Sequence, residues 1–290
     1  MWFGVAAYTV WGLSPLFWSL GEDIPALDLL LNRILWALPI LAVVITVQRH
    51  WPRVVAAYRV RNAGWISLLA SLFLAANWGV FIWAVTHEQV LAASLGYFIV
   101  PLVSVLLGVF VLGEHLRPMQ WAAISVGAFG VLVMALRIGD FPWVALSLGF
   151  SFGFYGLMKK RPETPRPLDS LFGEVSILAI PALLLLVFVR QPGEISLGTP
   201  LSTYTFLALT GVITVVPLLL FGAAAKRIPL STLGFLQYIA PTLQLIIGSV
   251  MLGEALTQER LFGFVIVWIA LALFSYDSYR STKKQSVNRS

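Results

Sequence analysis

The stretch "SLGYFIVP" occupies residues 94–101, and "TLGFLQYIAP" occupies residues 232–241. Their last residues, Pro101 and Pro241, lie 140 positions apart. The chain continues alike from each proline, as "PLVSVLLGVFVLGEHL" and "PTLQLIIGSVMLGEAL". Six of these sixteen positions are identical, and most of the others exchange one apolar residue for another. The chain therefore contains an internal repeat.

The amino-acid composition is too apolar for a soluble protein. Of its 290 residues, 59% are hydrophobic and only 11% are charged, and the mean hydropathy is +0.88. An ordinary soluble domain carries about 25% charged residues. A soluble fold this apolar could not cover its own surface, so the chain must be surrounded by lipid. The apolar runs are continuous, without the alternation of a barrel strand, and they predict an all-α polytopic membrane protein.

The number of spans follows from the thickness of a bilayer. A hydrocarbon core of about 30 Å needs about 20 apolar residues per helix. Applied to this sequence, that length predicts ten transmembrane helices, near residues 2–20, 27–47, 64–85, 92–112, 119–136, 141–158, 169–189, 202–221, 230–252 and 261–279.

The orientation follows from lysine and arginine, which are enriched in cytoplasmic loops. With the N-terminus inside, 15 of the 19 lie on the cytoplasmic side, three lie outside, and Arg33 lies within a span. Both termini are therefore predicted in the cytoplasm. The net charge of +6 is explained by this bias, so no nucleic-acid partner is expected.

The repeat divides the chain into two five-helix halves, residues 1–139 and 140–280, followed by a disordered cytoplasmic tail, residues 281–290. Because five is odd, the second half enters the membrane from the opposite side. Inverted five-helix repeats are typical of secondary transporters, whose substrate site lies near the bilayer midplane between the repeats.

Several segments resemble the RarD-type proteins of the EamA branch of the drug/metabolite transporter superfamily. The segments are "AAYTVWGLSPLFW" (6–18), "NRILWA" (32–37), "NWGVFIWAV" (77–85), "ASLGYFIVPLVSVLLGVFVLGE" (93–114), "FSFGFYGLMKK" (150–160) and "LSTLGFLQYIAPTL" (230–243). The resemblance implies a central cavity lined mainly by helices 1, 3, 4, 6, 8 and 9, and export or exchange of small metabolites or drugs across the inner membrane. Such proteins are labelled as affecting chloramphenicol sensitivity, a label that names no natural substrate.

Proline and glycine mark matched places in both halves. Pro101 and Pro241 lack a backbone donor, and Gly96 and Gly234 precede them. These four residues are candidate hinges, with static kinks as the alternative. The pairs Gly113–Glu114 and Gly253–Glu254 are interpreted as helix ends, with each glutamate favouring the positive start of the next helix.

Amide and aromatic side chains near these prolines suit an amphipathic ligand with a ring or a charge. The candidate substrate-binding residues are Trp11, Asn77, Trp78, Trp83, Tyr97, Phe98, Tyr155, Gln237 and Tyr238. For Asn77 and Gln237, the alternative is a hydrogen bond between helices, worth about 0.6 kcal/mol.

Two charges lie inside spans, Arg33 and Glu174, at positions 141 apart. Each lies about five residues, or roughly 8 Å, inside its span. In the inverted arrangement the two lie near opposite faces, so we expect no direct pair. They are candidates for gating or coupling, with Glu174 a candidate proton site. The alternative is that Arg33 reaches outward to the interface and Glu174 lies in a hydrated loop end.

Other functions fit the residues less well. The aspartates Asp28 and Asp169 lie near opposite faces, and no histidine lies in a span beside Ser14, so no enzyme is predicted. The chain has no cysteine, and its three histidines are far apart, so neither a metal nor a cofactor is expected. A channel would need a ring of equivalent ligands. The prediction is a secondary transporter of small amphipathic metabolites, amino acids among them; the alternative is a ligand sensor or a lipid flippase. The oligomeric state is left open.

Overall fold

A computed structural model describes residues 1–21, 23–87, 89–138, 141–188 and 201–251, and parts of 265–277. The described part is helical throughout and contains no strand. Its α-helices are α1 (Trp2–Leu13), α2 (Pro15–Trp18), α3 (Ala26–Val47), α4 (Trp51–Ala57), α5 (Ala63–Thr86), α6 (Val90–Phe110), α7 (Pro118–Ile138), α8 (Trp143–Lys160), α9 (Pro167–Phe188), α10 (Leu201–Ala225), α11 (Leu230–Leu236) and α12 (Ile239–Ile246). A 3₁₀ turn (Ser19–Gly21) follows α2, and a π-helical turn (Ile247–Met251) follows α12.

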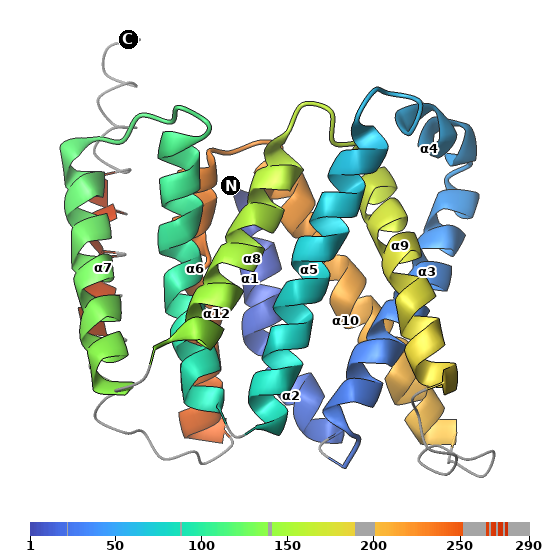
Figure 1. Cartoon of the computed structure of the whole chain (residues 1–290), viewed down its shortest axis with the longest axis horizontal. Coiled ribbons are helices and arrows are strands. Elements are labelled where there is room, and N and C mark those ends of the chain that lie inside the picture. The colour runs from blue at the N-terminus through green and yellow to red at the C-terminus, as the bar shows by residue number, and fades with distance from the viewer. Residues whose placement is uncertain are drawn as a thin grey trace.

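These helices form one bundle and overlap the first nine predicted spans (Figure 1). Six of the described segments are long and apolar enough to cross a membrane: 26–47, 63–86, 92–110, 167–188, 201–225 and 230–251. The tenth predicted span, 261–279, lies largely outside the described residues, as do the tail 281–290 and Gly253–Glu254. The all-helical membrane fold is thus confirmed, whereas the total of ten spans stays a prediction.

Two predicted spans are interrupted in the structure. The first breaks at Ser14, because Pro15 lacks a backbone N–H and starts the short helix α2. The ninth breaks at Gln237 and Tyr238, between α11 and α12. In contrast, α6 continues through Pro101 without a break.

Four connections lie at one end of the bundle, at the top of Figure 1: residues 48–62, which include α4, and residues 111–117, 161–166 and 226–229. We call this the basic-loop end, because these connections contain most of the loop lysines and arginines. Helix α4 was not predicted. It starts with Trp51 and Pro52, whose fixed φ suits the first turn of a helix.

The two sequence halves are interleaved. Helix α8 of the second half packs against α5 and α6 of the first, and α3 of the first packs against α9 and α10 of the second. Glycines permit the closest contacts. A Cβ on Gly153 of α8 would lie 2.5 Å from a Val103 methyl of α6, and Gly149, one turn earlier, presses on Ile99. This G-x-x-x-G spacing brings α8 and α6 together, since small residues let helices approach closely in lipid.

Glu114 also joins the halves. Gly113 ends the α6 segment with φ +67°, a backbone conformation suited to glycine. The Glu114 carboxylate then accepts hydrogen bonds from the backbone N–H groups of Leu230 (2.6 Å) and Ser231 (2.9 Å). Glu114 therefore stabilises the start of α11 in the other half. The expectation that it would serve the next helix, α7, is corrected by these bonds.

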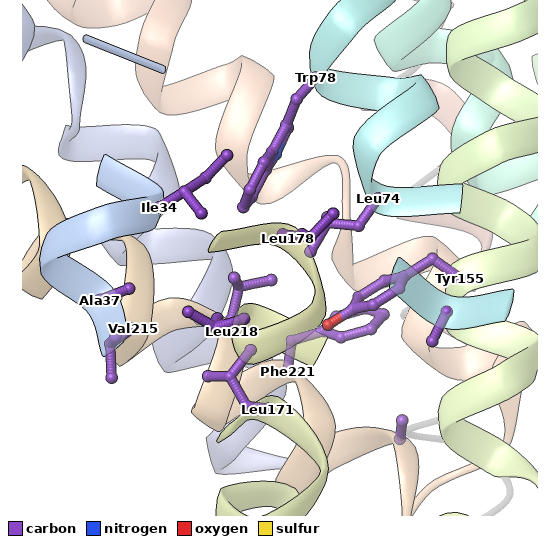
Figure 2. Packing of buried hydrophobic residues seen from close by; sticks show 14 of the residues in the cluster. Ile34, Ala37, Leu74, Trp78, Tyr155, Leu171, Leu178, Val215, Leu218 and Phe221 are labelled. Carbon is purple, nitrogen blue, oxygen red and sulfur yellow. The ribbon is translucent and has the colours of Figure 1, made fainter. Parts of the chain in front are cut away.

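The largest group of buried apolar side chains lies among α1, α3, α5, α8, α9 and α10 (Figure 2). Figure 2 shows Trp78 near Ile34 of α3, and Tyr155 against Phe221 of α10. This core holds the charged groups described next, because Arg33 and Glu174 belong to the same helices α3 and α9.

Candidate substrate site

Arg33 lies inside the bundle and touches both halves. It follows the start of α3 by seven residues, or about 10 Å of helix. Its Nε donates a hydrogen bond of 3.1 Å to Oγ1 of Thr214 in α10. Its guanidinium carbon lies 4.2 Å from the centre of the Trp78 ring in α5 and 5.8 Å from that of Trp18 in α2. A cation this close to an indole face is attracted by the ring's electron density.

Tyr97 is a more distant neighbour of Arg33. Its side chain, on α6, is near enough to act electrostatically on the guanidinium and is 42% exposed. Contacts with α2, α5 and α10 therefore direct the half-buried Arg33 side chain toward other helices of the bundle. The extension of Arg33 to the membrane interface stays the alternative.

Glu174 has a different kind of partner. Its carboxylate lies 2.5 Å from Nζ of Lys159, and the Ser170 hydroxyl donates to the same oxygen at 2.5 Å. The Tyr155 hydroxyl donates to the second oxygen at 3.2 Å. The Lys159 and Glu174 side chains are 2% and 0% exposed. A buried ion pair is tolerated when further hydrogen bonds satisfy its oxygens and protons, as they do here.

The two charged positions correspond to each other in the repeat. Trp18 and Arg33 precede Lys159 and Glu174 by 141 residues, and each pair lies together in space. In the second half a cation neutralises an anion. In the first half an aromatic ring stands where that cation would be. Arg33 is thus not neutralised in the way that Glu174 is.

Two predicted binding residues, Trp11 and Tyr155, meet in an aromatic cluster between α1, α8 and α10. Trp11 packs edge-on against Phe152, with ring centres 5.8 Å apart, and lies 6.0 Å from Phe221. Tyr155 stacks on Phe221 at 5.7 Å. Tyr155 is fully buried, whereas Trp11 is half-buried.

Asn77 and Trp83 make contacts between α5 and α8. The Asn77 amide donates to the Leu148 carbonyl and to the Ser151 hydroxyl, each at 3.1 Å. Trp83 lies near the C-terminal end of α5, with its ring 4.7 Å from that of Trp143 and stacked on His87 at 4.4 Å. The structure thus places the Asn77 amide in a hydrogen bond between helices, the alternative that the sequence left open.

Phe98, Gln237 and Tyr238 lie near the break between α11 and α12. The Tyr238 hydroxyl donates to the Phe98 carbonyl at 3.4 Å, and both rings are buried. The Ser104 hydroxyl donates to the Gln237 amide oxygen at 3.4 Å. These hydrogen bonds hold α6 against the segment that joins α11 to α12.

The candidate hinges of the two halves touch each other. A Cβ on Gly234 of α11 would lie 2.9 Å from the carbonyl oxygen of Pro101 in α6. Gly96 packs against Leu148 of α8 in the same manner, at 2.9 Å. Pro241 lies two residues inside α12, after the break. The glycines therefore serve close helix contact in this conformation.

An ionic contact between the two halves lies at the basic-loop end. Arg53 of α4 donates two hydrogen bonds of 3.1 Å to the Asp169 carboxylate at the start of α9. Tyr58 donates to the Asp169 carbonyl, and burial raises the pKa of Tyr58 to about 12. The two segments border a cleft of about 360 Å³. We call this contact the Arg53–Asp169 latch.

Sequence reasoning missed three partners: Lys159, Thr214 and Arg53. Lys159 had been assigned to a cytoplasmic loop, but it lies in the last turn of α8 and points inward. One signal could have found it, because Lys159 corresponds to Trp18 at the same 141-residue offset that relates Glu174 to Arg33. Thr214 carries no comparable signal, because threonines in membrane helices commonly bond to their own backbone.

The fold and the site together define the class: a polytopic, all-helical membrane protein with polar and charged side chains enclosed among its apolar helices. The profile of the EamA-like transporter family matches residues 1–136 and 142–276. Protein RarD of Streptomyces exfoliatus is 40% identical over 283 residues, covering 97% of this chain and 90% of the relative. The uncharacterized transporter YojE of Bacillus subtilis is 44% identical over 280 residues, covering 94% and 92%.

The fold also matches a crystal structure with a TM-score of 0.71 at 19% identity, covering 93% of this chain and 95% of the other. The chain belongs to the EamA-like transporter family, within the drug/metabolite transporter superfamily. It is therefore a membrane transporter of the drug/metabolite type.

Proposed function

We propose that this chain is a secondary transporter that moves small amphipathic metabolites or drugs across the inner membrane by alternating access, as an exporter or exchanger. Its two halves, residues 1–139 and 140–280, are inverted five-helix repeats, and both termini lie in the cytoplasm. The sequence repeat, the bias of the basic residues and the family's two matched segments support this arrangement.

One observation carries the proposal. Arg33 of the first half and Thr214 of the second half are bonded to each other among the apolar helices, beside Trp78. A binding group made by both halves can change its exposure when the halves move relative to each other. Ionisable residues inside a membrane bundle commonly mark substrate pathways. Arg33, Trp78 and Tyr97 therefore form the proposed substrate site.

The basic-loop end supplies contacts that such a movement would break. The Arg53–Asp169 latch joins α4 to α9, and Glu114 holds the start of α11. Both contacts join the two halves, so opening this end would separate Arg53 from Asp169. Gly96, Pro101, Gly234 and Pro241 are the proposed hinges, since each proline lacks a backbone donor and has a glycine upstream in the repeat.

Counterflow in proteoliposomes tests the proposal. Vesicles containing the purified chain are loaded with one unlabelled solute and then given the same solute in radiolabelled form, across a panel of amino acids and chloramphenicol. A carrier accumulates label transiently and saturably, whereas protein-free vesicles do not. Trp78→Ala is expected to reduce this uptake. Binding without counterflow would identify a sensor, and movement of a fluorescent lipid alone would identify a flippase.

A further inference from the structure

We propose that the solute carried by this protein is an anion, most simply a carboxylate attached to an apolar or aromatic group, and that Arg33 binds it. This inference deepens the proposed function and rests on it. It assigns a role to the guanidinium and a sign to the charge of the ligand. Both follow from what Arg33 lacks and from what surrounds it.

The hydrogen-bonding fork of Arg33 is open. A guanidinium has five N–H donors, and Arg33 uses only Nε, toward Thr214. Among the described residues, nothing accepts a hydrogen bond from its two terminal nitrogens. The two terminal nitrogens are not among the buried side-chain atoms that lack a partner, so they are not fully enclosed. The Arg33 side chain as a whole is half-buried. The two terminal groups are thus accessible and present the parallel donors that match a carboxylate.

The charge of Arg33 is also uncompensated within the described part of the chain. Three ion pairs occur there, and they employ Arg53, Arg117 and Lys159 as cations. The corresponding acid of the second half, Glu174, is neutralised by Lys159. A lone cation in a membrane bundle is costly unless an anion or water reaches it. An anionic solute supplies the missing charge.

The neighbours of Arg33 describe the remainder of the solute. The guanidinium lies close to the Trp78 ring and farther from the Trp18 ring. Tyr97 is an exposed ring near this group. Flat aromatic faces accept rings or hydrocarbon by stacking and contact. Thr214 fixes the orientation of the guanidinium from the opposite helix. The site therefore fits a charged head at Arg33 and an apolar body along the rings.

Protection from phenylglyoxal tests this assignment on the full chain. The reagent modifies accessible arginine side chains, and peptide mass spectrometry reports each arginine separately. Phenylacetate and phenylacetamide serve as matched probes, since they differ only in the charged group. We expect Arg33 to be modified, and phenylacetate to protect it at a concentration about tenfold lower than phenylacetamide does, because hydrogen bonds to an ionised acceptor are roughly twice as strong. Arg59, an exposed loop arginine, is the internal control, and phenylglyoxal should modify it to the same extent in the presence of either probe.

Each other result overturns the inference. An unreactive Arg33 would mean that its fork is inaccessible, and equal protection by the two probes would mean that charge is not recognised. Nanodiscs of phosphatidylcholine and of phosphatidylglycerol distinguish the source of the anion. Protection by phosphatidylglycerol alone would assign the site to a lipid headgroup instead of a solute.

The outcome is separable from that of the proposed function. Counterflow without selective protection of Arg33 would leave a transporter whose solute is not an anion. Selective protection without counterflow for any solute would leave an anion site in a protein that does not transport.

Discussion

The ammonium group of Lys159 lies 2.5 Å from the carboxylate of Glu174, and both side chains are almost completely buried. Lys159 is the second-last residue of α8, whereas Glu174 lies seven residues into α9. The pair therefore fixes two consecutive helices of the second half beside each other. The hydroxyls of Ser170 and Tyr155 donate further hydrogen bonds to the Glu174 carboxylate oxygens. Because its charge is already neutralised, Glu174 is better suited to bracing these helices than to binding a solute.

Breaking this pair is expected to destabilise the protein. Lys159→Met or Glu174→Gln alone should lower the free energy of unfolding by about 3–5 kcal/mol, since each leaves one buried charge without its partner. The double variant should lose less than either single variant, because no unpaired charge remains. Denaturant unfolding in detergent micelles measures the four members of this cycle. Additive losses in the double variant would contradict the buried pair.

A neighbouring lysine provides the control for this cycle. Lys160→Met changes the adjacent residue of α8 and leaves the Lys159–Glu174 contact intact. Lys160 is half-buried, so its effect on unfolding should be that of an average substitution, about 1 kcal/mol, and well below that of Lys159→Met.

The hydroxyl of Thr214 is expected to matter for the solute rather than for the fold. Thr214→Val removes the acceptor of the Arg33 Nε hydrogen bond while keeping the size of the side chain. A net hydrogen bond contributes about 0.5–1.5 kcal/mol, so the KM of counterflow should rise by up to about tenfold. Thr210→Val is the matched control, since the Thr210 hydroxyl, one turn earlier on α10, donates to the Leu207 carbonyl and not to Arg33. Equal effects of the two substitutions would argue against an oriented Arg33.

Loosening the Arg53–Asp169 latch is expected to open the basic-loop end. Arg53 is 32% exposed, but the Asp169 carboxylate that it bonds is only 1% exposed, so Arg53→Gln should cost about 1–3 kcal/mol and raise the open population by at least about fivefold. The chain has no cysteine, so a single Ser67→Cys reporter can be placed beneath Tyr58, where Ser67 is fully buried. Maleimide should label this cysteine faster in the Arg53→Gln background. Arg59→Gln, on the same connection, should leave the rate unchanged.

The membrane orientation of the repeats can be tested directly. His115→Cys and Ala255→Cys occupy positions 140 apart, and each follows the repeated "LGE" segment. In the inverted arrangement, an impermeant maleimide added to intact cells labels the cysteine at position 255 and spares the one at 115. Inside-out vesicles should give the opposite pattern. Labelling of both from the same side would exclude inverted halves.

The fold was largely predictable because its strongest signals are local. Long apolar runs define helices by length alone, and the helices overlap the first nine predicted spans within a few residues at most ends. The break at Ser14 and the short helix α4 were not predicted, because each depends on how a proline is used in context. Pro15 begins a helix, whereas Pro101 lies inside a continuous one.

The candidate site was less predictable because it depends on pairing across the sequence. Arg33 and Glu174 were identified as charges within spans, but their partners Thr214 and Lys159 could not be assigned. Residue type alone gives no information about rotation around a helix axis. That rotation is what places Asn77 against α8 and leaves Tyr97 partly exposed.

The close contact between α3 and α10 constrains how this protein is made. A Cβ on Gly211 would lie 2.8 Å from the Trp36 carbonyl carbon, so the two backbones touch. Helix α3 ends at Val47, whereas α10 ends only at Ala225. During translation, α3 therefore cannot pack against α10 until most of the polypeptide has been synthesised. A nascent chain arrested after α7 would lack the surface on which α3 comes to rest, so assembly of the N-terminal helices depends on the late arrival of the C-terminal ones.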